Sequence, residues 1–264
     1  MKTISLKFYD HVAEVTLNRP AQSNALNLDC FHEIIDAGEQ LIANTEVRSV
    51  ILSGNGKHFC AGLDKSMFPK NETDHEWFAS LAQKTYGPSD ANIFQRTALI
   101  WREIPVPVIA AIQGAAFGGG CQIALGADIR VADTNSQFSL RESHWGLIPD
   151  MAVSKTLPPL VRADLAAELI YTSAIIDAEK AQQIGLVTTV SDNYRETAFA
   201  LAKQIALKSP QAIRAAKKLS LSAWDSRNQD LLQLESKLQM ELFGSKEQLE
   251  CVRANIENRL QVFE

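Results

Sequence analysis

Three consecutive glycines, Gly118 to Gly120, constrain the fold of this chain more than any other stretch. They follow an apolar run over residues 106–112, which has the character of a buried strand and is ended by Gly114. Residues 121–125 come next, and their composition favours a helix. Because three glycines cost backbone entropy, this site requires either close packing of the helix on the strand or a ligand that approaches the backbone. In the second case the helix would begin with free N–H groups, which together with the helix dipole attract a negatively charged oxygen.

Hydrophobic periodicity predicts a mixed α/β chain. Alternating apolar and polar residues indicate a β-hairpin over residues 4–9 and 12–17, followed by a helix over 26–43 and a strand over 47–52. The polar stretch 65–92 is expected to be a variable connection. The remaining expected helices cover residues 94–102, 154–160, 163–171, 177–185, 196–207, 210–224, 228–243 and 246–263, and the remaining strands cover 129–132, 137–140 and 186–190.

The distribution of these elements divides the chain into an α/β core over residues 1–193 and an almost purely helical region over 194–264. The helical region carries an apolar stripe, which we expect to pack on the core or on a neighbouring subunit. The stripe consists of Leu231, Leu232, Leu234, Leu238 and Leu242.

Length and composition exclude several classes of protein. A chain of 264 residues is long enough for one large domain, or one domain with an appendage. The net charge of −5 arises from 26 basic and 31 acidic side chains that are well mixed, which argues against a nucleic-acid partner. No apolar run approaches the ~20 residues needed to span a membrane, and the N-terminus has no signal-peptide pattern. The four cysteines are dispersed without metal-site spacing, so we expect a cytoplasmic protein with no metal and no membrane contact.

Two glycine-containing motifs in order carry a resemblance to a known family. Residues 59–64, FCAGLD, are followed by residues 114–120, GAAFGGG, and this ordered pair resembles the crotonase superfamily of enoyl-CoA hydratases and isomerases. Residues 17–20, LNRP, and 24–26, NAL, are similar to the N-terminal loop of that family. Residues 177–187 are similar to its helix-then-strand region.

The resemblance extends over residues 3–220 and implies an α/β fold, a crotonase-like spiral of ββα turns with a C-terminal helical region for capping or trimerisation. It implies a homo-oligomer, either a trimer or a hexamer, and an acyl-CoA thioester substrate of which coenzyme A is part, with no separate cofactor. By the matching motifs, the backbone N–H groups of Leu63 and Gly119 would form an oxyanion hole for the thioester oxygen. The match assigns substrate binding to Ala25, Ala61, Gly62, Asp64, Lys65 and Gly118.

Three further positions decide which reaction the resemblance implies. Hydratases of the family use two carboxylates, and the first of these positions is Gln122 here, an amide that cannot act as a base. The second matches Glu142, while Asp150 matches an acidic position of the dienoyl-CoA isomerase branch. We therefore expect a double-bond shift through an enolate, with Glu142 as main base, Asp150 as second acid/base and Gln122 as a positioning donor.

The sequence alone leaves other reactions, and other roles for these three residues, open. The protein could instead add water to a 2-enoyl-CoA, or bind acyl-CoA without catalysis. Glu142 could form a surface salt bridge with Arg141, and Asp150 could cap the helix that follows it. Gln122 could belong simply to the start of its helix.

Overall fold

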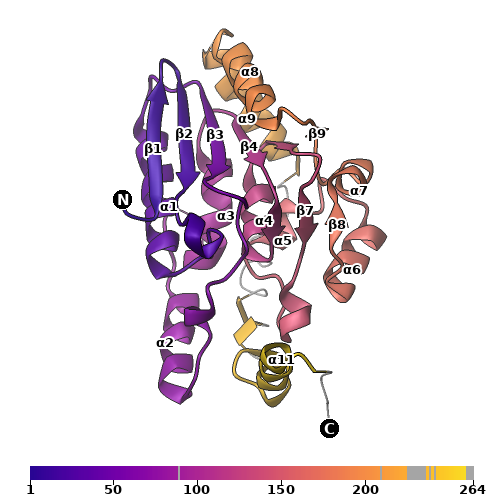
Figure 1. The fold of residues 1–264 in the computed structure, drawn as a ribbon. Helices are drawn as coiled ribbons and strands as arrows, with labels where there is room; N and C mark the ends of the chain where they lie inside the picture. Colours follow the sequence, from indigo (N-terminus) through magenta and orange to yellow (C-terminus); the bar gives the residue numbers. More distant parts are fainter. Residues whose placement is uncertain (89, 209, 225–235, 238, 241, 260–264) are drawn as a thin grey trace.

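A six-stranded sheet forms the centre of the fold (Figure 1), in a computed structural model that describes residues 1–264 except 89, 209, 225–235, 238, 241 and 260–264. Its strand order is β1-β2-β3-β4-β6-β9, with β1 antiparallel to β2 and the other neighbours parallel. The strands are β1 (Ile4–Tyr9), β2 (Val12–Leu17), β3 (Ser49–Gly54), β4 (Val108–Ile112), β6 (Ile129–Ala132) and β9 (Thr189–Val190).

Helices cover both faces of this sheet. The described α-helices are α1 (Leu28–Ala43), α2 (Glu72–Gln83), α3 (Ile93–Glu103), α4 (Gly119–Gly126), α5 (Val153–Thr156), α6 (Ala163–Thr172), α7 (Ala178–Gln183), α8 (Tyr194–Ala206), α9 (Pro210–Trp224) and α11 (Lys246–Glu257). Side chains alternate between the faces of a strand, so Val50 and Leu52 of β3 join the core of α1 and α3, whereas Ile51 joins the core of α8. Both faces of β3 are therefore buried, as is typical of parallel sheets.

A smaller sheet runs beside the large one and gives the chain its spiral. It contains β5 (Ala115–Phe117), β7 (Gln137–Ser139) and β8 (Ile176–Asp177), and two isolated parallel bridges extend it, Cys60 to Ala116 and Leu26 to Leu63. Each turn thus adds a strand to the large sheet, extended backbone to the small sheet, and then a helix. The predicted ββα spiral with C-terminal helices is confirmed.

Most predicted elements agree with the structure within two residues, and the hairpin of β1 and β2 is confirmed. The helix expected from residue 26 begins at Leu28, because the Asn27 side chain accepts from the Cys30 N–H at 3.0 Å and Leu26 is held in the bridge to Leu63. The strand expected over residues 186–190 is reduced to β9 and the helix expected over 154–160 to α5.

No helix was predicted within residues 65–92, which were expected to be a variable region. This stretch contains α2, whose first turn is capped by the Asn71 side chain accepting from the Asp74 N–H at 2.9 Å. Phe78 and Ala82 of α2 are buried in the core. The helix is stabilised by this packing, which its polar composition does not reveal.

The C-terminal region could be compared with prediction only in part. The predicted helix 210–224 is confirmed as α9, and the predicted helix 246–263 ends earlier, at Glu257 of α11. Most of the predicted helix 228–243 and four leucines of its stripe lie outside the described residues, and Leu242 packs on the core. Among the helices that the structure describes, none is long and apolar enough to cross a membrane.

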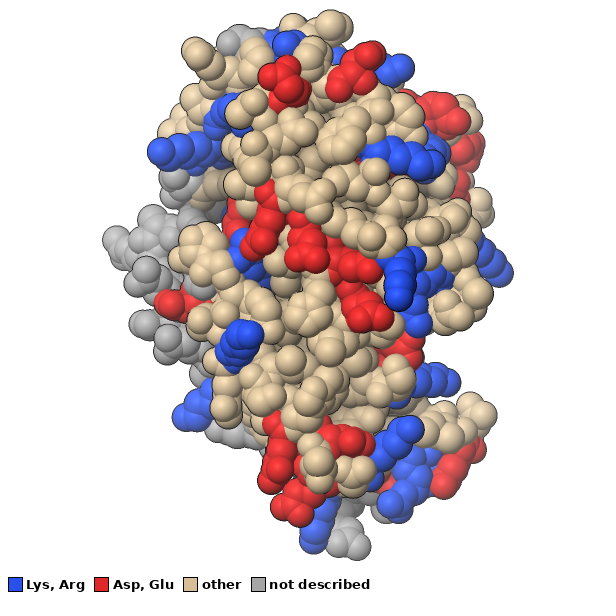
Figure 2. Space-filling view, turned by 90° about the vertical axis from the view of Figure 1, so that its left-hand side faces the viewer, with Lys and Arg blue, Asp and Glu red and all other residues tan. Residues whose placement is uncertain are grey.

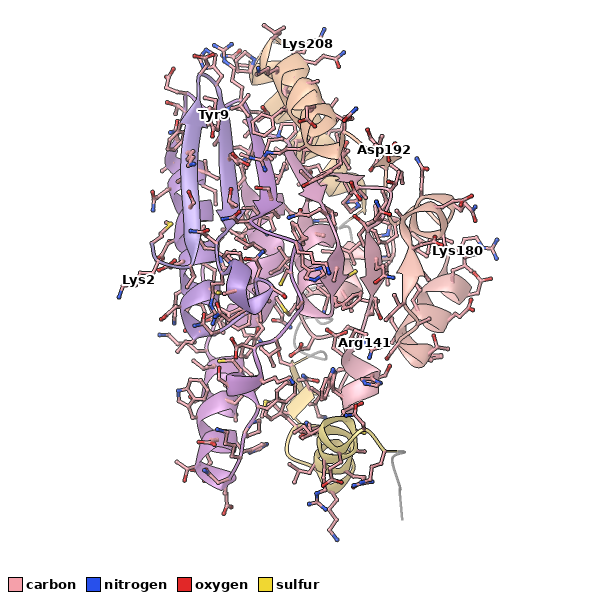
Figure 3. The ribbon with its side chains drawn as sticks, viewed as in Figure 1. Lys2, Tyr9, Arg141, Lys180, Asp192 and Lys208 are labelled. Atoms are coloured by element: carbon pink, nitrogen blue, oxygen red, sulfur yellow. The ribbon has the colours of Figure 1, made fainter. Side chains whose placement is uncertain are left out.

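Charged side chains of both signs lie on the face beside β1, where acidic groups gather near the centre and basic groups lie around them (Figure 2). The active-site candidates lie elsewhere, at the end of the large sheet from which α2 and α11 project. Arg141, the neighbour of Glu142, lies near that end, whereas Tyr9 and Lys208 lie at the opposite end (Figure 3).

Candidate active site

A cavity of about 430 Å³ collects nearly all the residues that the sequence analysis selected. It is bounded by the loop after η1 (Pro20–Gln22), by η2 (Lys65–Met67), by the start of α4 and by η3 (Glu142–Trp145). The selected residues that line it are Ala25, Ala61, Gly62, Leu63, Asp64, Lys65, Gly118, Gly119, Glu142 and Asp150. Its volume is in the range of small-molecule sites, so a cavity able to hold an acyl group lies at the predicted place.

The glycines at the start of α4 permit close packing, and two of them line the cavity. Gly118 has φ +51°, and a Cβ there would lie 3.1 Å from Oε1 of Glu142. A Cβ on Gly120 would lie 2.4 Å from the carbonyl oxygen of Cys60, so this glycine permits close packing of helix on loop. Gly119 lines the cavity as the first residue of α4. Close packing and access to the cavity therefore coexist at this helix start.

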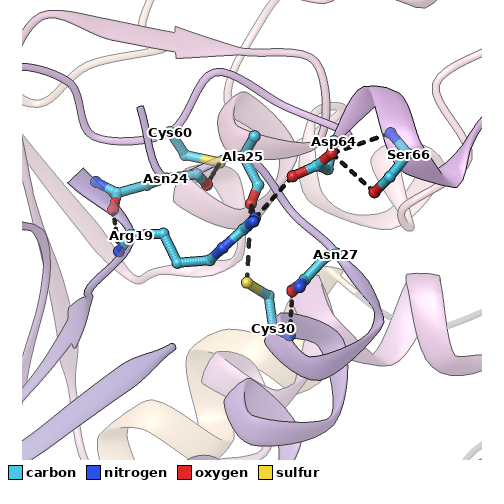
Figure 4. A network of polar contacts seen from close by, with 8 residues as sticks. All are labelled: Arg19, Asn24, Ala25, Asn27, Cys30, Cys60, Asp64 and Ser66. Atoms are coloured by element: carbon cyan, nitrogen blue, oxygen red, sulfur yellow. Dashed lines mark hydrogen bonds and ion pairs between the residues drawn. The ribbon is translucent and has the colours of Figure 1, made fainter. Parts of the chain in front are cut away.

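A network of polar contacts fixes the loop that carries Leu63 (Figure 4). The buried Asn24 amide donates to the carbonyls of Asn55, His58 and Phe59, at 2.8 to 3.1 Å. The Arg19 guanidinium donates to the Ala25 carbonyl and lies 2.9 Å from the Asp64 carboxylate.

Asp64 closes this network on the far side of the loop. Burial acts to raise its pKa, but hydrogen bonds from Ser66 and the charge and hydrogen bond of Arg19 hold the pKa below its ordinary value. Its side chain also accepts from the Ser66 N–H at 3.0 Å, which caps η2. Asp64 is therefore an ionised structural anchor, and its predicted contact with substrate remains a prediction.

The backbone N–H groups of Leu63 and Gly119 have no acceptor among the residues that the structure describes. The neighbours of Leu63 are paired, since Leu26 N–H donates to the Gly62 carbonyl and Asp64 N–H donates to the Leu26 carbonyl. The N–H groups of Leu63 and Gly119 themselves donate to no hydrogen bond in the part of the chain that the structure describes. A Cβ on Gly62 would lie 3.7 Å from the Gly119 nitrogen, so the two loops are in contact. Both unpaired donors belong to residues of the cavity wall.

Glu142 is held from behind by Gln122. The fully buried Gln122 donates from Nε2 to Oε1 of Glu142 at 2.7 Å, and its Oε1 accepts from the Met151 N–H at 2.9 Å. Oε2 of Glu142 is buried and has no hydrogen-bond partner among the described residues. Gln122 thus orients the carboxyl group and ties it to the segment that carries Asp150.

The surroundings of Glu142 make it a carboxyl group that titrates near neutrality. Burial raises its pKa to about 7, against the lowering effects of the Gln122 hydrogen bond and the Arg141 charge. The alternative, a surface salt bridge between Glu142 and Arg141, is not found among the described residues. The Arg141 guanidinium donates instead to the Ser173 carbonyl at 3.3 Å. A group with a pKa near the working pH can both accept and return a proton.

This raised pKa predicts that Glu142 lowers the stability of the protein above neutral pH. The folded state holds more protons than the unfolded chain between about pH 4.5 and 7, so the contribution of Glu142 to the free energy of unfolding falls as pH rises through that range. Glu142→Gln should therefore raise the free energy of unfolding by about 1–3 kcal/mol at pH 8 and change it little at pH 4.5. Urea denaturation at both pH values measures this, and an equal effect at both would contradict a raised pKa.

Asp150 lines the same cavity as Glu142. The helix after it, α5, has Ala152 as its N-cap with φ +60°, so Asp150 does not cap that helix. The Met151 N–H that follows Asp150 donates to Gln122, so one amide side chain connects the Glu142 carboxyl group with the backbone next to Asp150. The described residues include no group of three or more His, Cys, Asp or Glu that could hold a metal ion.

Several residues of the cavity wall were not anticipated. Phe78 comes from the unpredicted helix α2, and Gln239 comes from the C-terminal region. No motif in the sequence connects these positions with the glycine loops. Arg19 and Asn24 did carry a signal, because both lie in the N-terminal loop motif, but that motif gave them no role.

Comparisons with known proteins agree with this geometry. A family model described as enoyl-CoA hydratase/isomerase matches residues 7–264. The chain is 33% identical to a short-chain-enoyl-CoA hydratase of Clostridium acetobutylicum over 98% of this chain and 96% of that protein. It is 28% identical to a mitochondrial Delta(3,5)-Delta(2,4)-dienoyl-CoA isomerase of Mus musculus over 94% of this chain and 77% of that protein. The crystal structure of an enoyl-CoA hydratase/isomerase from Pseudoalteromonas atlantica is similar with a TM-score of 0.84 at 27% identity, over 100% of both chains.

Proposed function

We propose that this chain, which belongs to the enoyl-CoA hydratase/isomerase family, moves a double bond within an enoyl- or dienoyl-CoA thioester. The observation that carries the proposal is the Glu142 carboxyl group, which has one oxygen held by Gln122 and the other without a partner among the described residues. It lies at a cavity whose wall also includes Leu63 and Gly119, and within the described chain their N–H groups have no acceptor. A single oriented base next to an oxyanion hole is what enolate formation requires.

The proposed reaction with a 3-enoyl-CoA has two proton transfers and no net change in composition. Glu142 takes a proton from C2, and the electron pair of that C–H bond delocalises over the C3=C4 double bond and the thioester carbonyl, which gives a dienolate with negative charge on the thioester oxygen. The N–H groups of Leu63 and Gly119 donate to this oxygen as its negative charge develops. A proton then returns to C4, with Asp150 or Glu142 as the acid, and gives the 2-enoyl-CoA.

Hydration of a 2-enoyl-CoA is the second candidate, and the curated relative from Clostridium acetobutylicum named as a hydratase favours it. Water addition needs a group opposite Glu142 that holds the water and exchanges a proton with it. Gln122 can orient a water, but it cannot take a proton, and its amide is engaged with both Glu142 and Met151. We therefore give preference to double-bond migration.

Gln122→Glu tests this reasoning and should raise the hydration of crotonyl-CoA at least ~10-fold, since proton transfer by a positioned group contributes roughly 10²–10⁴-fold. The new carboxyl group can still accept from the Met151 N–H, and beside Glu142 the pair would share one proton. Steady-state absorbance at the enoyl band measures the rate. Gln122→Met, of similar length without polar atoms, is the control and should lower both reactions. Unchanged hydration in Gln122→Glu would show that the neutral amide is not what limits water addition.

The remaining inferences from the family are proposals of the same kind. They comprise the acyl-CoA contacts of Ala25, Ala61, Gly62, Lys65 and Gly118, a trimeric or hexameric assembly, the division at residue 193, and a cytoplasmic location. A non-catalytic acyl-CoA binding protein would hold the thioester without turnover, and the oriented, partly desolvated carboxyl group of Glu142 argues against it.

A further inference from the structure

One wall of the cavity is built from phenylalanines that belong to different parts of the chain. Phe31 of α1, Phe78 of α2 and Phe94 of α3 all line the cavity and are buried. Phe78 is stacked between two rings: its centroid lies 4.7 Å from that of Phe94, at an interplanar angle of 16°, and 4.0 Å from that of Phe243, at 9°. Because both faces of Phe78 are covered, only its edge can face the cavity.

The third ring of this wall is oriented differently from the stack. Phe31 meets Phe94 edge to face, with centroids 5.1 Å apart and an interplanar angle of 88°. The hydrogens at the edge of an aromatic ring carry partial positive charge, whereas its faces are negative. The edge of Phe78 therefore favours a ligand that offers a π face or an oxygen lone pair.

Gln239 adds a hydrogen-bond donor beside this wall. The Phe243 N–H donates to the Gln239 carbonyl at 2.8 Å, so the two side chains lie one helical turn apart on the same side, and the Phe243 ring is the one that stacks on Phe78. Gln239 lines the cavity and is only 4% exposed. Its Oε1 accepts from the Ile148 N–H at 3.3 Å, while its Nε2 donates to no hydrogen bond among the described residues.

Since Nε2 of Gln239 has no acceptor among the described residues, it can donate to an oxygen of a ligand that enters the cavity. The positive edge of Phe78 and the N–H donor of Gln239 both line the cavity. Both favour a ligand that offers π electrons or an oxygen lone pair. A saturated aliphatic chain would satisfy neither, since it has no π face and no acceptor.

We propose that the acyl group of the substrate ends in an electron-rich aromatic ring that carries an oxygen substituent, such as a hydroxyaryl or methoxyaryl group. The face of the ring would lie against the edge of Phe78, and its oxygen would accept from Nε2 of Gln239. A cavity of about 430 Å³ has room for a single ring together with the thioester. This inference rests on the proposed function for the thioester, and it adds the class of acyl group.

Binding measurements with thioesters that cannot react test the class of acyl group independently of the proposed reaction. Calorimetry with wild-type protein should compare three saturated probes, the CoA esters of 3-(4-methoxyphenyl)propanoate, 3-phenylpropanoate and 3-cyclohexylpropanoate. We expect Kd to rise by roughly 3–10-fold at each step in that order, from the loss of the hydrogen bond and then of the ring contact. Equal values, or tightest binding of the cyclohexyl ester, would overturn the proposal.

Gln239→Met tests the donor at nearly constant side-chain length. In this variant the methoxyphenyl and phenyl esters should bind with a Kd ratio near 1, and the phenyl ester serves as the internal reference for any disturbance of the Ile148 contact. Gln22→Met is the matched control, because Gln22 also lines the cavity but is exposed, and it should keep the wild-type ratio. A wild-type ratio in Gln239→Met would refute the role of the donor. Tight binding of the aryl probes without turnover of a 3-enoyl-CoA would refute the reaction and leave this inference standing.

Discussion

Replacing Glu142 with Gln should lower kcat for double-bond migration by ~10²–10⁴-fold, the usual contribution of a positioned proton-transfer group. The substituted amide keeps the size of the side chain and can still accept from Gln122, so binding of a saturated acyl-CoA should remain near the wild-type value. Stopped-flow or steady-state absorbance measures the rate, and calorimetry measures the binding. Glu168→Gln, at an exposed position of α6, is the control and should leave both unchanged.

The pH dependence of kcat provides an independent test of Glu142 as the proton-transfer group. With a pKa of about 7, Glu142 is ionised and able to accept a proton above that pH, so kcat should fall to about a tenth of its plateau at pH 6. The residual activity of Glu142→Gln should not share this profile. A variant that keeps most of its activity, or the wild-type pH dependence, would remove Glu142 from the proton transfer.

The second large effect is expected at Leu63, where proline removes the N–H group. Leu63→Pro should lower kcat by ~10²–10³-fold, as expected for the loss of one oxyanion-hole donor. The Leu63 N–H donates to no hydrogen bond in the described structure, so the substitution removes no hydrogen bond of the fold. Leu63→Ala keeps the N–H group and reports the loss of side-chain packing alone. If both variants lose activity equally, with equal Tm, the backbone donor has no part in the reaction.

The hairpin, the first helix and the two glycine loops could be predicted from local constraints, whereas the spiral was implied by the resemblance to the family. Asn27 caps α1 and alternating apolar residues form β1 and β2, so local pattern and tertiary structure agree there. At Gly118 the positive φ favours glycine, and a Cβ there would also crowd the Glu142 side chain; the run of glycines does not distinguish between these two reasons.

The residues that line the far wall of the cavity could not be predicted, because their proximity depends on long-range packing. Helix α2 has a largely polar sequence, and the stacking of Phe78 on Phe94 and Phe243 is what holds it against the core. Gln239 reaches the cavity from the C-terminal region, far along the chain from Ile148, to which it is bonded. Neither periodicity nor a motif encodes such contacts, whereas the roles proposed for Glu142 and Gln122 follow from the positions that the resemblance to the family assigns to them.

The relation between Gln122 and Glu142 explains why this site differs from one with two carboxylates. Two adjacent carboxyl groups would repel each other when ionised and would share a proton. The amide removes that repulsion, donates to Glu142 and accepts from Met151, so it fixes one base rather than providing a second. The account therefore depends on a site with a single oriented base next to the oxyanion donors.

The decisive measurement compares the rates at which the wild-type enzyme catalyses double-bond migration and hydration. A 3-enoyl- or dienoyl-CoA and a 2-enoyl-CoA of equal chain length should be followed separately, by absorbance and by mass, since only hydration adds a water. The account predicts that migration is at least ~10-fold faster than hydration. Hydration of the 2-enoyl-CoA at a turnover on the order of 10²–10³ per second, that of an efficient enzyme, would contradict it.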